Sequence, residues 1–238
     1  MPSKILDYLF DLSPHTWLRK YHRDSILWIL VMAFFYHLLS VGMMYGGSAL
    51  LIEIIPEYET PSFPVSLSLA IISGPLEEGL FFGIPYYLGG TAYSVLVGGI
   101  IWSVAHIFGT QTLTLNSLAY ANFLATIPHL FFSLRTWVSG KGWFAILFHS
   151  AWNVAFVLSY CSTGILSCVV LSSGDQMITE ILAIASACSV ISIVYILYRK
   201  PRIPATRFRL VMVLSASVFA VTQIIMTAKY MQIFFTWP

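Results

Sequence analysis

The stretch PLEEGLFFGIP, residues 75–85, places two adjacent glutamates inside an apolar run that extends from residue 65 to residue 88. About 20 consecutive apolar residues are enough for a helix to cross the hydrocarbon layer of a bilayer. A carboxylate near the bilayer centre costs about 2.5–3.5 kcal/mol on insertion scales, so Glu77 and Glu78 need a functional reason to be there. The stretch therefore predicts a membrane helix that carries part of a functional site.

The composition of the whole chain agrees with a membrane protein. Of its 238 residues, 58% are hydrophobic and only 9% are charged, whereas soluble domains carry about 25% charged residues. The mean hydropathy is +0.82. The sequence has no Lys/Arg tract of the kind that binds nucleic acid. We therefore expect an all-α fold, a multi-pass transmembrane helical bundle, rather than a soluble α/β or all-β domain.

Seven apolar segments have about the length of a membrane helix. The predicted spans cover residues 26–46, 65–88, 92–109, 117–135, 143–160, 177–198 and 209–230. The segment before them, residues 1–25, mixes apolar and basic side chains, and it fits an interfacial segment or a flexible tail about equally well. The simplest domain organisation is this N-terminal segment followed by one transmembrane domain, residues 26–238.

The basic residues predict an orientation in the membrane. If the N-terminus is cytoplasmic and the seven spans alternate in direction, 11 of the 12 Lys and Arg residues fall inside, and only Lys229 falls outside. The acidic loop with Glu53, Glu57 and Glu59 also falls outside. Because short cytoplasmic loops are enriched in Lys and Arg, we expect a cell-membrane protein with a cytoplasmic N-terminus and an external C-terminus.

Three of the predicted spans carry polar residues that can form one site. Glu77 and Glu78 lie in the second span, His106 in the third, and His149 and Asn153 in the fifth. His149 and Asn153 are four residues apart and share a helix face, whereas adjacent residues are about 100° apart, so only one glutamate can point straight into a cavity. A glutamate beside another carboxylate suits a base that later returns its proton. A His/Asn pair can donate hydrogen bonds to a developing oxyanion.

Each of these residues also has a purely structural interpretation. A buried histidine often serves packing, and Glu78 or Asn153 can form a hydrogen bond between helices. Gly79 and Gly83 form a G-x-x-x-G, which most simply predicts a close helix contact. His129 in the fourth span is left unassigned. For five residues on three helices we favour a shared site, because ionisable groups inside membranes are usually functional.

Three short motifs on these spans resemble the CPBP family, named for CAAX proteases and bacteriocin-processing enzymes and also called the Abi family. Its pattern is E-E-x-x-x-R, then F-x-x-x-H, then H-x-x-x-N/D, each on a membrane helix. The corresponding segments here are Glu77-Glu78-Gly-Leu-Phe-Phe82, Trp102-Ser-Val-Ala-His106 and His149-Ser-Ala-Trp-Asn153, within a motif core of about residues 70–157. Two positions depart from the pattern, because Phe82 replaces the arginine and Trp102 replaces the phenylalanine.

The resemblance implies an intramembrane endopeptidase that hydrolyses a membrane-associated or lipidated substrate, either of the CAAX type or bearing a leader. It implies that Glu77 and His106 activate the attacking water, that His149 and Asn153 stabilise the oxyanion, and that Glu78 supports them. The expected partners are a peptide or protein substrate and the lipid bilayer. No cofactor is expected; the alternative is Zn²⁺ with Glu77, His106 and His149 as ligands.

Two other functions use the same polar residues. A proton-coupled transporter would use them as a proton relay, although paired repeats typical of transporters are not visible in the sequence. A non-catalytic membrane scaffold would bind a helix in the polar cavity, and the loss of the arginine at Phe82 favours this alternative slightly.

Overall fold

The structure is a computed structural model, and it describes residues 24–52, 63–64, 67–108, 117–163, 168–169 and 173–236. The predicted N-terminal segment, residues 1–25, therefore lies almost wholly outside the described residues.

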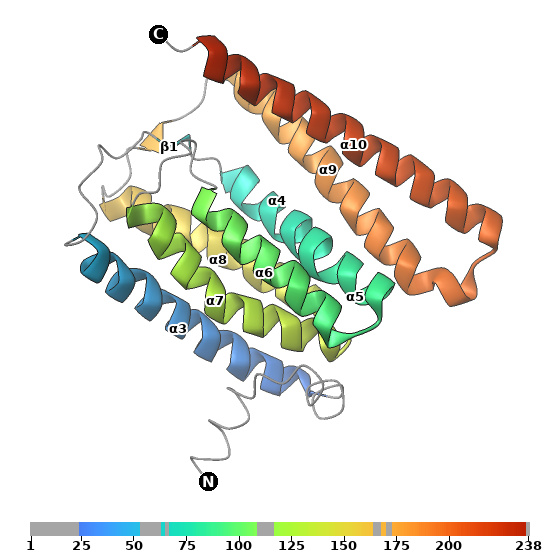
Figure 1. Ribbon diagram of the computed structural model, residues 1–238, viewed down its shortest axis with the longest axis horizontal. Helices are drawn as coiled ribbons and strands as arrows, with labels where there is room; N and C mark the ends of the chain where they lie inside the picture. Colours follow the sequence, from blue (N-terminus) through green and yellow to red (C-terminus); the bar gives the residue numbers. More distant parts are fainter. Residues whose placement is uncertain are drawn as a thin grey trace. The chain divides into compact units, whose positions relative to one another are not determined.

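Helices lie at each of the seven predicted spans (Figure 1). They are α3 (Ile26–Ile52), the consecutive pieces α4 (Leu67–Glu77), the π-helix η1 (Glu78–Gly83) and α5 (Ile84–Gly89), then α6 (Ala92–Phe108), α7 (Ser117–Val138), α8 (Gly142–Thr163), α9 (Ser173–Arg199) and α10 (Ala205–Thr236). A short 3₁₀ turn, η2 (Lys200–Arg202), joins the last two helices. The two-residue strands β1 (Phe63–Pro64) and β2 (Cys168–Val169) pair in parallel. The all-α prediction is confirmed.

Length and hydropathy identify fewer clear membrane spans than the sequence analysis predicted. Among the described residues, four segments are long and apolar enough to cross a bilayer: Ile26–Gly46, Leu67–Gly89, Met177–Arg202 and Ala205–Ala228. Ala92–Ile107 and Gly142–Leu158 are apolar but shorter. Helix α7 is in neither group, and its polar residues Asn122, His129 and Arg135 lower its hydropathy. The chain is thus a multi-pass membrane protein with four clear spans.

The chain forms two compact units that interleave along the sequence. The first comprises residues Met1–Tyr58 and Phe81–Ala145, and the second comprises residues Glu59–Leu80 and Ile146–Pro238. The chain therefore passes from the second unit to the first within the π-helix η1.

In the first unit α7 packs between α3 and α6, as Figure 1 shows. A buried ion pair ties the start of α3 to the end of α7: Arg135 Nη2 lies 3.5 Å from Asp24 Oδ2, and the Arg135 side chain is 0% exposed. The Lys141 ammonium donates a hydrogen bond to the Asp24 backbone carbonyl. Pairing is necessary here because a lone buried charge is very costly. These contacts place Asp24, Arg135 and Lys141 at one end of the unit.

In the second unit α9 packs against α4 on one side and α10 on another. A Cβ added at Gly79 would lie 2.5 Å from Val190 Cγ1 of α9, so the glycine permits a close approach. Helix α10 runs beside α9 (Figure 1). Ser186 and Thr222 share a hydrogen bond of 2.6 Å, and Gln223 donates one of 3.1 Å to Ser186. These polar bonds link α9 to α10 where the surroundings are otherwise apolar.

The approach of α8 to α4 depends on the sequence Gly74-Pro75. A proline inside a helix has no N–H, so the carbonyl of the residue four positions before it loses its helical partner. That carbonyl belongs to Ile71, and the Ser150 hydroxyl of α8 donates a hydrogen bond of 2.8 Å to it. Hydroxyl side chains from neighbouring helices commonly satisfy such carbonyls in membranes. Gly74 provides the space, since an added Cβ would lie 2.7 Å from Ser150 N and 3.0 Å from Ile146 O.

We therefore predict that Gly74→Ala destabilises the protein. The added methyl group would force α8 away from α4, and overpacking of this kind costs about 1–3 kcal/mol in free energy of unfolding, more than the ~1 kcal/mol that alanine gains in helix propensity. Gly42→Ala on α3 is the matched control, because a Cβ there meets nothing within 4 Å. Thermal unfolding in detergent should show a lower Tm for the first variant only. Equal Tm values for both variants would contradict the close contact.

Candidate active site

The two glutamates lie where the helix changes its geometry. Glu77 ends α4, and Glu78 begins the π-helix η1. A π-helix hydrogen-bonds each residue to the fifth along instead of the fourth, is rare, and is often found at functional sites. In a regular α-helix, as expected from the sequence, only one of two adjacent side chains points straight into a cavity. The structure differs, since both carboxylates contact the same side chain on α8.

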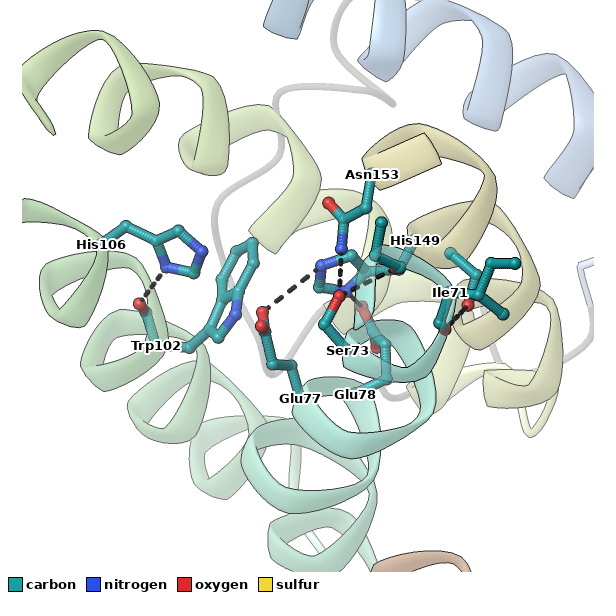
Figure 2. Close-up of polar contacts among 10 residues, drawn as sticks. Ile71, Ser73, Glu77, Glu78, Trp102, His106, His149 and Asn153 are labelled. Atoms are coloured by element: carbon teal, nitrogen blue, oxygen red, sulfur yellow. Dashed lines mark hydrogen bonds and ion pairs between the residues drawn. The ribbon is translucent and has the colours of Figure 1, made fainter. Parts of the chain in front are cut away.

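That side chain is His149, which lies between the two carboxylates (Figure 2). Its Nδ1 lies 3.2 Å from Glu78 Oε1, and its Nε2 lies 3.4 Å from Glu77 Oε2. An ionised carboxylate only accepts hydrogen bonds, so a ring nitrogen that bonds to one must carry a hydrogen: a neutral ring can donate from one nitrogen, a protonated ring from both. The two contacts fix the position of the ring from both of its nitrogen atoms.

The two glutamates differ in their access to the surroundings. The Glu78 side chain is 0% exposed and the His149 side chain 3%, whereas the Glu77 side chain is 25% exposed. Glu78 is therefore an internal anchor for His149. Glu77 is the carboxylate that a molecule outside the protein core can reach.

Asn153 forms a second link between α8 and α4, one helical turn from His149. Its Nδ2 donates a hydrogen bond of 2.7 Å to Ser73 Oγ, and Ser73 Oγ donates one of 2.9 Å to the Ala70 carbonyl. Ser73 was missed in the sequence analysis. A signal was available, because Ser73 precedes Glu77 by four residues and so shares its helix face. This spacing matches that of His149 and Asn153 on α8.

The second unit thus brings together four of the five predicted site residues: Glu77, Glu78, His149 and Asn153. The fifth, His106, belongs to the first unit and is half-buried on α6. Its Nδ1 lies 2.9 Å from the Trp102 carbonyl, as Figure 2 shows. Since a carbonyl oxygen only accepts, Nδ1 carries the hydrogen in this contact.

The two departures from the family pattern contact each other in the first unit. Phe82 is fully buried. The centroid of its ring lies 5.6 Å from that of the Trp102 ring, at an interplanar angle of 65°. Edge-to-face pairs of this kind contribute about 0.5–1.5 kcal/mol beyond the burial of their area. The centroid of the Trp102 ring in turn lies 4.6 Å from that of the His106 ring and 5.3 Å from that of the His129 ring. An aromatic stack therefore fills the position where the family has an arginine.

We predict that Phe82→Arg lowers the stability of the folded protein sharply, although arginine is the residue of the family pattern. The position is 0% exposed and lies against the Trp102 ring, and an unpaired buried charge costs far more than a lost aromatic contact. Phe82→Leu, which keeps the site apolar, should cost about 1–3 kcal/mol in free energy of unfolding. Thermal unfolding should rank wild type first, then Phe82→Leu, then Phe82→Arg. An arginine variant as stable as the wild type would mean that an anion reaches this position.

Comparison with known protein families gives a match over the middle of the chain. Residues 59–155 match the family model described as type II CAAX prenyl endopeptidase Rce1-like. The matched segment contains all five predicted site residues as well as Ser73. No curated protein and no solved structure matched the chain. The match confirms the resemblance that was drawn from the three motifs.

Proposed function

Residues 59–155 belong to the Rce1-like family of type II CAAX prenyl endopeptidases, a family of proteases, and from this premise we propose how the chain hydrolyses its substrate. The chain is a hydrolase in a membrane, and its substrate is a peptide. Our proposal is that this substrate is a lipidated or leader-bearing peptide, and that a water molecule activated by glutamate and histidine cleaves it.

The observation that carries the proposal is the position of His149 between two glutamates of unequal exposure. Glu78 is buried and holds Nδ1, so Nε2 remains on the side of the accessible Glu77. A carboxylate that is reachable and lies beside an N–H donor suits a general base. Glu77 takes a proton from the attacking water, whose oxygen bonds to the carbonyl carbon of the scissile peptide.

Collapse of the resulting tetrahedral intermediate breaks the C–N bond. The amine leaves with the proton that Glu77 held, so Glu77 is regenerated as a carboxylate and the products are a carboxylic acid and an amine. We assign His106 as the partner of Glu77 in activating the water. The match to the family motif supports this role, since His106 stands at the histidine of the second motif within the matched residues.

We assign His149 and Asn153 as the donors to the oxyanion. They lie one turn apart on α8, and His149 Nε2 and Asn153 Nδ2 both face the α4 residues of the site. Preorganised donors stabilise the charge that develops on the carbonyl oxygen. Glu78 supports His149 through Nδ1 and does not itself contact the reacting atoms in this proposal.

We predict that Glu77→Gln abolishes cleavage of a prenylated CAAX peptide by the protein in lipid nanodiscs. The amide keeps the size of the side chain but cannot accept the proton of the water. Expression and Tm should stay near those of the wild type, since Glu77 is partly exposed. Glu180→Gln on α9 is the matched control and should retain activity. Full activity of Glu77→Gln would rule out this residue as the base.

The same experiment separates the other two functions. A scaffold would bind the peptide without cleaving it, in the wild type as in the variant. A proton-coupled transporter would show no cleavage but a proton flux in liposomes that depends on Glu77.

We further predict that the active protein needs no tightly bound metal. A metal-free mechanism gives both glutamates and Asn153 a role, and this supports the prediction. Chelator-treated protein should retain its turnover with far less than one zinc per chain by elemental analysis. Stoichiometric zinc, with activity lost on its removal, would contradict this prediction, and substitution of Glu77, His106 and His149 would then test them as the ligands.

The orientation in the cell membrane is also a proposal, with a cytoplasmic N-terminus and an external C-terminus. The contacts of Asp24 with Arg135 and Lys141 support it, since they place these basic residues on the side where α3 begins. Reporter fusions after Ser139 and after Pro238 should report the cytoplasmic and the external side, respectively. Both reporters on one side would contradict the alternation of seven spans.

A further inference from the structure

Ser73 lies on α4 in contact with the site residue Asn153, and it belongs to none of the three motifs. It occupies the turn of α4 before Glu77, and Asn153 occupies the turn of α8 after His149. The contacts Glu77–His149 and Ser73–Asn153 are therefore two successive links between the same two helices, visible side by side in Figure 2. The first link holds the base against one donor, and the second involves the other donor.

The directions of the hydrogen bonds determine which end of the Asn153 amide faces α4. The Ser73 hydroxyl has one hydrogen, and it is used in the bond to the Ala70 carbonyl. Ser73 Oγ can then only accept from Asn153, at 2.7 Å. An asparagine side chain turned by 180° would present its carbonyl oxygen to the Ser73 oxygen, and the two acceptors would repel each other. Ser73 thereby holds the NH₂ group, and not the carbonyl, on the side of the site.

We propose that Ser73 is a positioning residue that fixes the Asn153 amide in the orientation needed to donate to the oxyanion. The inference rests on the proposed function, because it assumes that Asn153 is such a donor. An amide turned the other way would place a lone pair where negative charge develops. Ser73 thus acts through Asn153 on the chemical step, and it does not contact the reacting atoms.

Ser150 provides the comparison that separates positioning from general support. Its hydroxyl also links α8 to α4, by a bond of 2.8 Å, but to the Ile71 backbone carbonyl rather than to a side chain of the site. If Ser73 only held the two helices together, removal of either hydroxyl should have the same consequence. If Ser73 orients Asn153, only its removal should slow turnover.

The experiment measures kcat, KM and Tm for Ser73→Ala, Ser73→Thr, Ser150→Ala, Asn153→Ala and the double variant Ser73→Ala/Asn153→Ala, with a prenylated CAAX peptide in nanodiscs. Asn153→Ala should lower kcat by about 10²–10³-fold, as for other oxyanion donors. Ser73→Ala should lower kcat by roughly 3- to 10-fold, the equivalent of one neutral hydrogen bond, with KM little changed. Ser73→Thr keeps the hydroxyl and should restore kcat. Ser150→Ala should lower Tm and leave kcat near that of the wild type.

The double variant is the decisive measurement. Since Ser73 acts through Asn153, Ser73→Ala should have no further effect on kcat once Asn153 is alanine. Independent, multiplying effects, or wild-type kcat in Ser73→Ala, would overturn the inference while a slow Asn153→Ala kept the proposed function intact. Wild-type turnover in Asn153→Ala would overturn the oxyanion role and the inference together. If Ser73→Ala does not fold, Ser73→Cys, whose thiol is a weak acceptor, replaces it in the same cycle: no further effect on kcat beside Asn153→Ala supports the inference, and a multiplying effect contradicts it.

Discussion

The contact of one imidazole ring with two carboxylates is the constraint on which the site depends. In an apolar interior a charged group must be paired with another, and His149 satisfies Glu77 and Glu78 at once. The difference in exposure between the two glutamates then divides their tasks, since one is available for chemistry and the other is not. The contacts of His149 therefore stabilise two carboxylates within a membrane helix and also leave the more exposed one, Glu77, available for reaction.

Several irregularities of α4 serve this contact. Pro75 frees a backbone carbonyl, Ser150 satisfies it, and Gly74 lets the two helices approach closely enough for the bond to form. Three residues after Pro75 the helix changes to the π form at Glu78. Each feature would weaken an isolated helix. Here the neighbouring helix compensates the loss, and the irregular backbone occurs where the polar side chains are needed.

The sequence predicted the helices well because each apolar run is bounded by clear polar, glycine or proline signals. It also singled out Glu77, Glu78, His149 and Asn153, which lie together in the second unit, since such residues are conspicuous within apolar helices; their catalytic roles stay a prediction. The contact of both glutamates with His149 could not be predicted, because the π-helix that begins at Glu78 has no simple sequence signature. Ser73 was missed for a related reason, since serine is common and unremarkable in membrane helices and only its partner makes it significant. The packing of Phe82 on Trp102 likewise depends on positions far apart in the sequence.

Helix α10 shows how loosely part of such a protein can be attached. Only 6% of its apolar window is buried, and between helices surrounded by lipid tails there is no hydrophobic force to drive association. Its attachment to α9 relies on close packing and on the hydroxyl and amide groups of Ser186, Thr222 and Gln223. During biosynthesis α10 can thus enter the bilayer as an independent span and dock laterally afterwards. Solvents that compete for hydrogen bonds would detach it before they disturb the helices that carry the glutamates.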